Sequence, residues 1–80
     1  MWMQLTQREA EQVRLGSARP GTINLTVLVM LQGRLQMRGV AGELELTERE
    51  LRDVQTAARR WQWGGERAFK AVLSAADRHQ

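Results

Sequence analysis

The sequence predicts an α+β fold, in which helices cover one face of a small antiparallel sheet. Three observations lead to this prediction. The segments Thr6–Glu9 and Thr47–Glu50 each read Thr-x-x-Glu, the capping box with which many helices begin. Between them, apolar residues alternate along Thr22–Leu31, which is typical of a strand. After the second capping box, Gly64 and Gly65 divide a long helical pattern into two helices.

The first helix is expected to begin after Thr6 and to run to about Leu15. Gly16 follows, and glycine readily adopts the left-handed conformation that closes many helices. The segment Ser17–Gly21 contains a Pro-Gly pair, which suits a turn. We therefore expect a short helix and a loop before the sheet.

The segment Thr22–Leu31 is expected to form the first strand, because its apolar residues recur at every second position. Leu28 and Met30 also place apolar side chains on the opposite face. That face meets solvent in a sheet covered on one side only. Two alternatives follow: either the first helix covers these residues, or Leu28 and Met30 form an apolar contact patch.

A second strand is expected at Leu35–Arg38, where apolar and polar residues alternate. A three-residue loop, Gln32–Arg34, would pair Leu31 with Leu35 and bring the apolar faces together, whereas a two-residue loop would mix the faces. The segment Glu43–Leu46 alternates again and predicts a short third strand.

The second helix is expected to run from Thr47 to about Gln62. Its apolar stripe consists of Leu51, Val54, Ala58 and Trp61. The third helix is expected over Glu66–Arg78, with a buried face of Phe69, Val72, Leu73 and Ala76. The predicted order is thus α-β-β-(β)-α-α, with a C-terminal helical hairpin and residues 1–80 in a single domain.

Composition excludes several classes of protein. The 80 residues include 12 Lys and Arg, 9 Asp and Glu, and no cysteine, with a net charge of +3. Without cysteine there is no disulfide framework, no thiolate zinc site and no thiol nucleophile. The longest apolar run, Val27–Leu31, is far too short for a membrane span. No secretory signal is visible, so we expect a cytoplasmic protein without a membrane partner.

Catalytic residue types are scarce. His79 is the only histidine and lies beside the C-terminus, while Ser17 and Ser74 have no base next to them in the sequence. Glu43 and Glu45 share a strand face, and paired carboxylates can transfer protons, but a solvated sheet edge is the better interpretation. No phosphate-binding glycine loop or metal-ligand spacing is present. We therefore expect no enzyme, no metal and no cofactor.

Basic and aromatic residues supply the candidate contact surface. The residues expected to bind a partner are Arg34, Arg38, Arg59, Arg60, Trp63, Arg67 and Lys70. Trp61 continues the apolar stripe of its helix and is expected in the core, whereas Trp63 falls off the stripe. Arginine and tryptophan are enriched at protein interfaces. The cationic residues also suit contact with an acidic protein patch or with nucleic acid.

The function that these observations favour is a non-enzymatic binding module that acts by stoichiometric contact with a protein or nucleoprotein complex. Small inhibitors encoded by phages and mobile elements take this form, including those that block CRISPR nucleoprotein complexes. The comparison rests on size and on the absence of site chemistry.

Two alternatives remain open. The first is a small basic regulator that binds nucleic acid through its C-terminal helices, with Glu66–Ser74 as the reading helix of a motif that resembles helix-turn-helix in outline. The second is a homodimeric subunit of a larger assembly.

Overall fold

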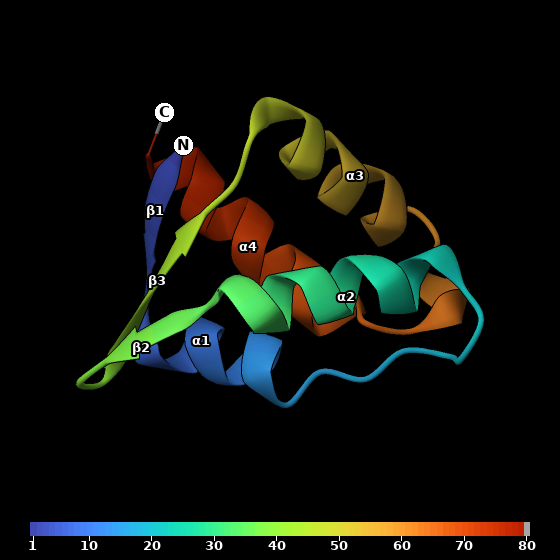
Figure 1. The fold of residues 1–80 in the computed structure, drawn as a ribbon, viewed down its shortest axis with the longest axis horizontal. Helices are drawn as coiled ribbons and strands as arrows, with labels where there is room; N and C mark the ends of the chain where they lie inside the picture. The colour runs from blue at the N-terminus through green and yellow to red at the C-terminus, as the bar shows by residue number, and fades with distance from the viewer. Residues whose placement is uncertain (80) are drawn as a thin grey trace.

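The computed structural model describes residues 1–79 and is built from helices and one three-stranded sheet. In chain order the elements are β1 (Trp2–Leu5), α1 (Gln7–Arg14), α2 (Ile23–Arg34), β2 (Gln36–Arg38), β3 (Ala41–Glu45), α3 (Glu48–Ala58), the 3-10 helix η1 (Trp61–Trp63) and α4 (Glu66–Arg78). The helices lie to one side of the sheet (Figure 1). The predicted α+β class is therefore confirmed, with its N-terminal helix and C-terminal helices.

The sheet has the strand order β1-β3-β2, and both neighbouring pairs are antiparallel. Met3 lies opposite Leu44, and both side chains are buried against the helices together with Leu5. Successive side chains point to opposite faces of a strand, so Gln4 and Glu43, which also lie opposite each other, belong to the outer face. Strand β1 was not predicted, because its partner strand lies far away in the sequence.

The prediction of a strand at Thr22–Leu31 is wrong, because these residues lie in or next to the helix α2. Thr22 is the N-cap residue, and its hydroxyl accepts a hydrogen bond from the backbone N–H of Leu25 at 3.3 Å. The buried residues of α2 follow helical spacing and are Asn24, Val27, Leu28 and Leu31. Apolar residues on the exposed side, such as Val29, produced the alternation that suggested a strand.

The predicted loop Gln32–Arg34 is wrong for the same reason, since these residues form the last turn of α2. Leu35 does not pair across a hairpin with Leu31. Its backbone N–H donates to the carbonyl of Leu31 at 3.0 Å and thereby closes the helix. Only the second and third predicted strands are present, as β2 and β3.

The hairpin between β2 and β3 turns through two residues, because Arg38 lies opposite Ala41. Gly39 has a φ of +63°, the conformation that a type II′ turn requires at this position. The next glycine, Gly42, faces the core, where a Cβ would lie 2.8 Å from Leu35 Cδ1. A larger residue at this position would therefore require the Leu35 side chain to move.

Both predicted capping boxes are present, at α1 and at α3. Thr6 and Glu9 exchange side-chain and backbone hydrogen bonds, and Thr47 and Glu50 do the same. Helix α4 packs against α1, α3 and β1, so it is the central helix of the fold. Its buried residues are Ala68, Phe69, Ala71, Val72, Ala75 and Ala76.

Candidate interaction surface

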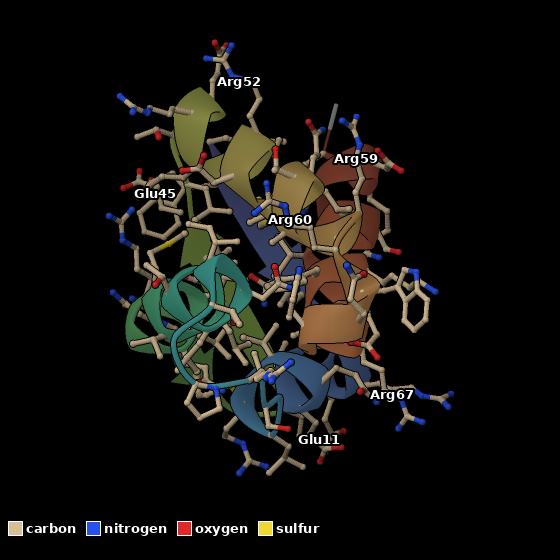
Figure 2. All side chains as sticks on the ribbon, turned by 90° about the vertical axis from the view of Figure 1, so that its right-hand side faces the viewer. Glu11, Glu45, Arg52, Arg59, Arg60 and Arg67 are labelled. Carbon is tan, nitrogen blue, oxygen red and sulfur yellow. The ribbon has the colours of Figure 1, made fainter. Side chains whose placement is uncertain are left out.

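The structure divides the predicted contact residues into three groups. Arg34 and Arg38 lie near the hairpin end of the sheet. Arg59, Arg60 and Trp63 lie where α3 meets α4, and Arg67 and Lys70 lie on α4. In Figure 2, Arg59 and Arg60 lie near the end of α3, and Arg67 lies apart from them near the start of α4. The seven residues therefore do not form one continuous surface.

Arg34 and Arg38 are engaged within the chain. Arg34 forms a bidentate ion pair with Glu50, with N–O distances of 2.6 and 2.7 Å. The pKa of Glu50 lies below its ordinary value because the Thr47 backbone N–H and then the Arg34 guanidinium bind its carboxylate, although burial opposes this shift. The Nε atom of Arg38 lies 3.8 Å from Glu43 Oε2. Each of these two cations is thus offset by a neighbouring carboxylate.

The corner between α3 and α4 presents three adjacent residues to solvent, which we call the arginine corner: Arg59, Arg60 and Trp61. Helix α3 ends at Ala58, and a single turn of 3-10 helix follows. No carboxylate within residues 1–79 forms an ion pair with Arg59 or Arg60. The corner therefore carries free cationic groups beside an aromatic ring.

The solvent exposure of the two tryptophans of η1 is the reverse of what the sequence suggests. Trp61 is 67% exposed, so its assignment to the core is wrong, and Trp63 is half-buried. The helical period ends at Ala58, and the tighter 3-10 turn rotates Trp61 away from the stripe that it was expected to continue. Reasoning from the sequence therefore missed Trp61 as a surface residue, and only the early helix stop could have identified it.

Hydrogen bonds from other segments fix the backbone of this corner. The side-chain amide of Asn24 donates to the carbonyls of Arg60 and Gly64, at 2.7 and 2.9 Å. The N–H of Arg19 donates to the carbonyl of Trp63 at 2.8 Å. Gly64 has a φ of +92°, and a Cβ there would lie 2.8 Å from Ala18 Cα. The exposed side chains are therefore held on a rigid support.

Arg67 and Lys70 line a shallow groove of about 450 Å³ between α1 and α4. The other residues that line this α1–α4 groove are Arg8, Glu9, Gln12, Ala71 and Ser74. Glu9 is ion-paired with Arg78, whose Nη2 lies 2.5 Å from Glu9 Oε1. Arg78 is the largest cause of the lowered pKa of Glu9, and hydrogen bonds from Thr6 add to it against the effect of burial. The groove is consequently basic.

The apolar contact patch of Leu28 and Met30 does not exist as a surface. Leu28 is 1% exposed, and Met30 is half-buried against the core. The cause is the helical conformation of this segment, which turns Leu28 inward with Val27 and Leu31. The sheet face that both alternatives assumed is absent, because the segment is a helix, and both α1 and α3 pack against it.

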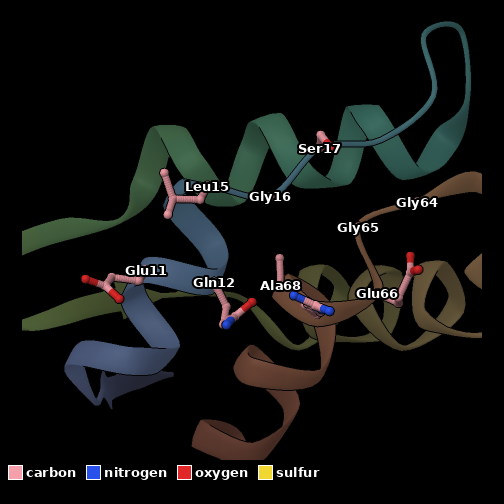
Figure 3. A pocket seen from close by; sticks show the side chains of 10 residues that line it. Glu11, Gln12, Leu15, Gly16, Ser17, Gly64, Gly65, Glu66 and Ala68 are labelled. Carbon is pink, nitrogen blue, oxygen red and sulfur yellow. The ribbon is translucent and has the colours of Figure 1, made fainter.

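A deeper cavity of about 460 Å³ separates the end of α1 from the start of α4 (Figure 3). It is lined by Glu11, Ser17, Glu66 and Arg67 among others. Glu66 Oε2 is buried and has no hydrogen-bond donor among the described residues. No histidine lines the cavity, and neither of the carboxylates that line it, Glu11 and Glu66, forms a hydrogen bond with the Ser17 hydroxyl in the described part of the chain, so no nucleophile–base pair is present there.

His79, the remaining candidate for catalysis, makes a structural contact. His79 Nε2 accepts a hydrogen bond from the backbone N–H of Gln4 at 2.9 Å, which ties the end of α4 to the edge of β1. Within residues 1–79, no three His, Cys, Asp or Glu side chains are grouped so as to hold a metal ion. None of the helices that the structure describes has the length and apolar character needed to cross a bilayer.

The chain matches no family model, no curated protein and no solved structure. The functional argument therefore rests on the surfaces described above.

Proposed function

We propose that this protein is a non-enzymatic binding module that acts by stoichiometric contact between the arginine corner and a negatively charged surface of a protein or nucleoprotein partner. The observation that carries this proposal is the exposure of Trp61, at 67%, directly beside Arg59 and Arg60. Tryptophan and arginine are the residue types that most often dominate the binding energy of protein interfaces.

Rigidity supports the proposal. A contact residue on a mobile loop loses backbone conformational entropy on binding, at a cost of about 1–2 kcal/mol per residue, in addition to the entropy of its side chain. The backbone of the arginine corner is already fixed by hydrogen bonds from Asn24 and Arg19. A partner would therefore order side chains only.

The charge distribution favours an anionic partner. In the described part of the chain, Glu9, Glu43 and Glu50 are engaged by other arginines, and none of them reaches Arg59 or Arg60. Free guanidinium groups steer an oppositely charged surface toward the corner and suppress cationic partners. The exposed indole of Trp61 then supplies apolar area that becomes buried on contact.

Nucleic-acid binding is the second candidate, and the α1–α4 groove is the observation that favours it. Arg8, Arg67 and Lys70 line this groove and could contact phosphates. However, α4 is flanked by α1 and α3, so it does not project as the reading helix of a helix-turn-helix motif must. Contacts would be to the phosphate backbone, without base-specific readout.

Two binding measurements separate these candidates. The first is fluorescence anisotropy with labelled duplex and single-stranded oligonucleotides at about 50 and 200 mM salt, where phosphate contacts weaken steeply with salt. With oligonucleotides that carry no 5′-phosphate, the proposal predicts negligible binding to either one. Salt-dependent binding that Arg67→Glu with Lys70→Glu abolishes would overturn it in favour of nucleic-acid binding.

The second measurement is capture of partners from nuclease-treated lysate of the host cell, compared between charge-reversal variants. Arg59→Glu with Trp61→Ala should lose a protein that the wild type retains, and reconstitution with that protein should give a one-to-one complex. Arg52→Glu is the matched control, since Arg52 is exposed on α3 outside the arginine corner (Figure 2). Equal capture by all three proteins would contradict the proposal.

A further inference from the structure

A separate hollow of about 430 Å³ lies beside the arginine corner, at the start of α2. Its lining residues are Arg19, Gly21, Thr22, Ile23, Arg60 and Trp63. Two of these six residues are cationic and none is acidic. We call this site the corner hollow; it shares only Arg60 with the arginine corner.

The two guanidinium groups of the corner hollow are free to bind an anion. Within residues 1–79, neither Arg19 nor Arg60 is ion-paired with a carboxylate. The guanidinium carbon of Arg19 lies 5.6 Å from the centroid of the Trp63 ring, a cation–π distance that holds the group in place. Arginine presents a planar fork of donors that matches the oxygens of a phosphate group.

The start of α2 adds positive potential to the same site. The hydroxyl of Thr22 accepts from the N–H of Leu25 and donates to the carbonyl of Arg19, at 3.3 and 2.7 Å. The first N–H groups of a helix have no acceptor within the helix, and this helix has no acidic residue in its first turn. The helix dipole therefore reinforces the two arginines in favouring an anion.

The other wall of the corner hollow is apolar. Ile23 is 47% exposed there, and Trp63 is half-buried. Inorganic phosphate would leave this wall and most of the volume unused. A phosphate that carries a planar group would use both, because bases stack on aromatic rings and on guanidinium planes.

We propose that the corner hollow binds a nucleoside monophosphate unit, with the phosphate at Arg19 and Arg60 and the base against Ile23 and Trp63. The unit is either a free nucleotide or the 5′-phosphorylated end of a single strand. This site does not rest on the proposed function, which concerns the arginine corner and a macromolecular partner, although Arg60 belongs to both surfaces.

Tryptophan fluorescence tests the site directly. The chain has three tryptophans, so Trp2→Phe with Trp61→Phe leaves Trp63 as the only indole. Titration of this variant with AMP should change the emission of Trp63 saturably. Adenosine, which lacks the phosphate, and ribose 5-phosphate, which lacks the base, should each bind at least tenfold more weakly.

Arginine variants show whether the corner hollow is responsible. In this background, Arg19→Ala should weaken AMP binding about tenfold or more, because one charge-assisted hydrogen-bonding group is lost. Arg52→Ala is the matched control and should leave the affinity unchanged, because Arg52 is exposed on α3 and lines neither the hollow nor the arginine corner. Arg19→Lys keeps the charge but not the planar fork, and it should also bind AMP more weakly. It replaces Arg19→Ala in the test if the alanine variant fails to fold.

A 5′-phosphorylated oligodeoxyadenylate and the same strand without the phosphate distinguish the two sources. Tighter binding of the phosphorylated strand than of AMP identifies a strand end, and tighter binding of AMP identifies a free nucleotide. The proposal is overturned if adenosine or ribose 5-phosphate binds as tightly as AMP, or if Arg19→Ala binds AMP as well as the control does. None of these results depends on finding a macromolecular partner.

Discussion

The side-chain amide of Asn24 donates a hydrogen bond of 2.7 Å to the backbone carbonyl of Arg60, a residue 36 positions later in the chain. A second bond from the same amide reaches the carbonyl of Gly64 at 2.9 Å. Asn24 is completely buried, although its neighbours in the core are apolar. This one side chain therefore joins the start of α2 to the corner that carries the candidate surface.

Replacing Asn24 should destabilise the fold. Asn24→Ala leaves two partly buried carbonyl oxygens without these donors, at a total cost of about 1–3 kcal/mol. Asn24→Asp should be worse at neutral pH, because it places a carboxylate oxygen where the amide donated. Urea unfolding measures both changes, with the exposed substitution Gln55→Ala as control. A loss equal to that of the control would show that the bonds to the corner contribute nothing.

Leu28 and Val29 distinguish a helix from a strand at this segment. Leu28→Ala should cost about 2–5 kcal/mol, as core leucines do, because Leu28 is 1% exposed. Val29→Ala should change stability by less than about 0.5 kcal/mol, because Val29 is 55% exposed. The free energies of unfolding of the two variants decide the matter. A larger loss at Val29 would indicate the strand that residue alternation suggests.

Local signals in the sequence predicted much of the fold. The capping boxes at Thr6 and Thr47 and the glycine pair after Trp63 depend on neighbours within a few residues, so the helix starts they imply are present. The segment Thr22–Leu31 misled because it is apolar on nearly every side, which leaves period two and period 3.6 equally plausible. Its N-cap Thr22 and its length were the signals for a helix.

The candidate site was less predictable. Residue type identified Arg59 and Arg60, but an ion pair depends on distant neighbours. The sequence could not show that Glu50 engages Arg34, or that Arg19 lies beside Trp63. Trp61 was assigned to the core because the helix was extended four residues too far, from Ala58 to Gln62. Tertiary contacts therefore decided which cations remain free.

Replacement by alanine should have opposite effects on stability at two glycines. Gly33→Ala should stabilise the protein by about 0.5–1 kcal/mol, because Gly33 lies in α2 and an added Cβ meets no atom. Gly65→Ala should destabilise it, because Gly65 has a φ of +83° and a Cβ would lie 2.8 Å from the Phe69 ring. Thermal unfolding of both variants is the measurement. An equal shift of the melting temperature in both variants would mean that the backbone conformation and surroundings of these glycines do not affect stability.

Stability should fall in acid through two capping-box carboxylates. The pKa of Glu9 lies below its ordinary value of 4.5, chiefly because Arg78 binds the carboxylate, and Thr6 contributes a backbone hydrogen bond. The pKa of Glu50 is lowered in the same way by Thr47 and Arg34. A carboxyl group with a lower pKa in the folded state stabilises the fold above its unfolded pKa. That stabilisation is lost as the pH falls through the folded value.

The expected loss therefore begins below about pH 4.5. Urea unfolding between pH 7 and pH 3 measures it, and Glu9→Gln with Glu50→Gln should flatten the profile while lowering stability at pH 7. If the free energy of unfolding of this double variant fell with pH as steeply as that of the wild type, the two carboxylates would not cause the loss of stability in acid.

Site-specific photo-crosslinking in cells that produce the protein tests most directly whether the arginine corner is the working surface. A photoreactive phenylalanine derivative replaces Trp61 in one variant and the equally exposed Val40, on the sheet hairpin, in another. If the corner binds a partner, the probe at position 61 forms a single nuclease-resistant protein adduct that the probe at position 40 does not form. Absence of an adduct at 61, or the same adduct at both positions, would contradict stoichiometric binding through this corner.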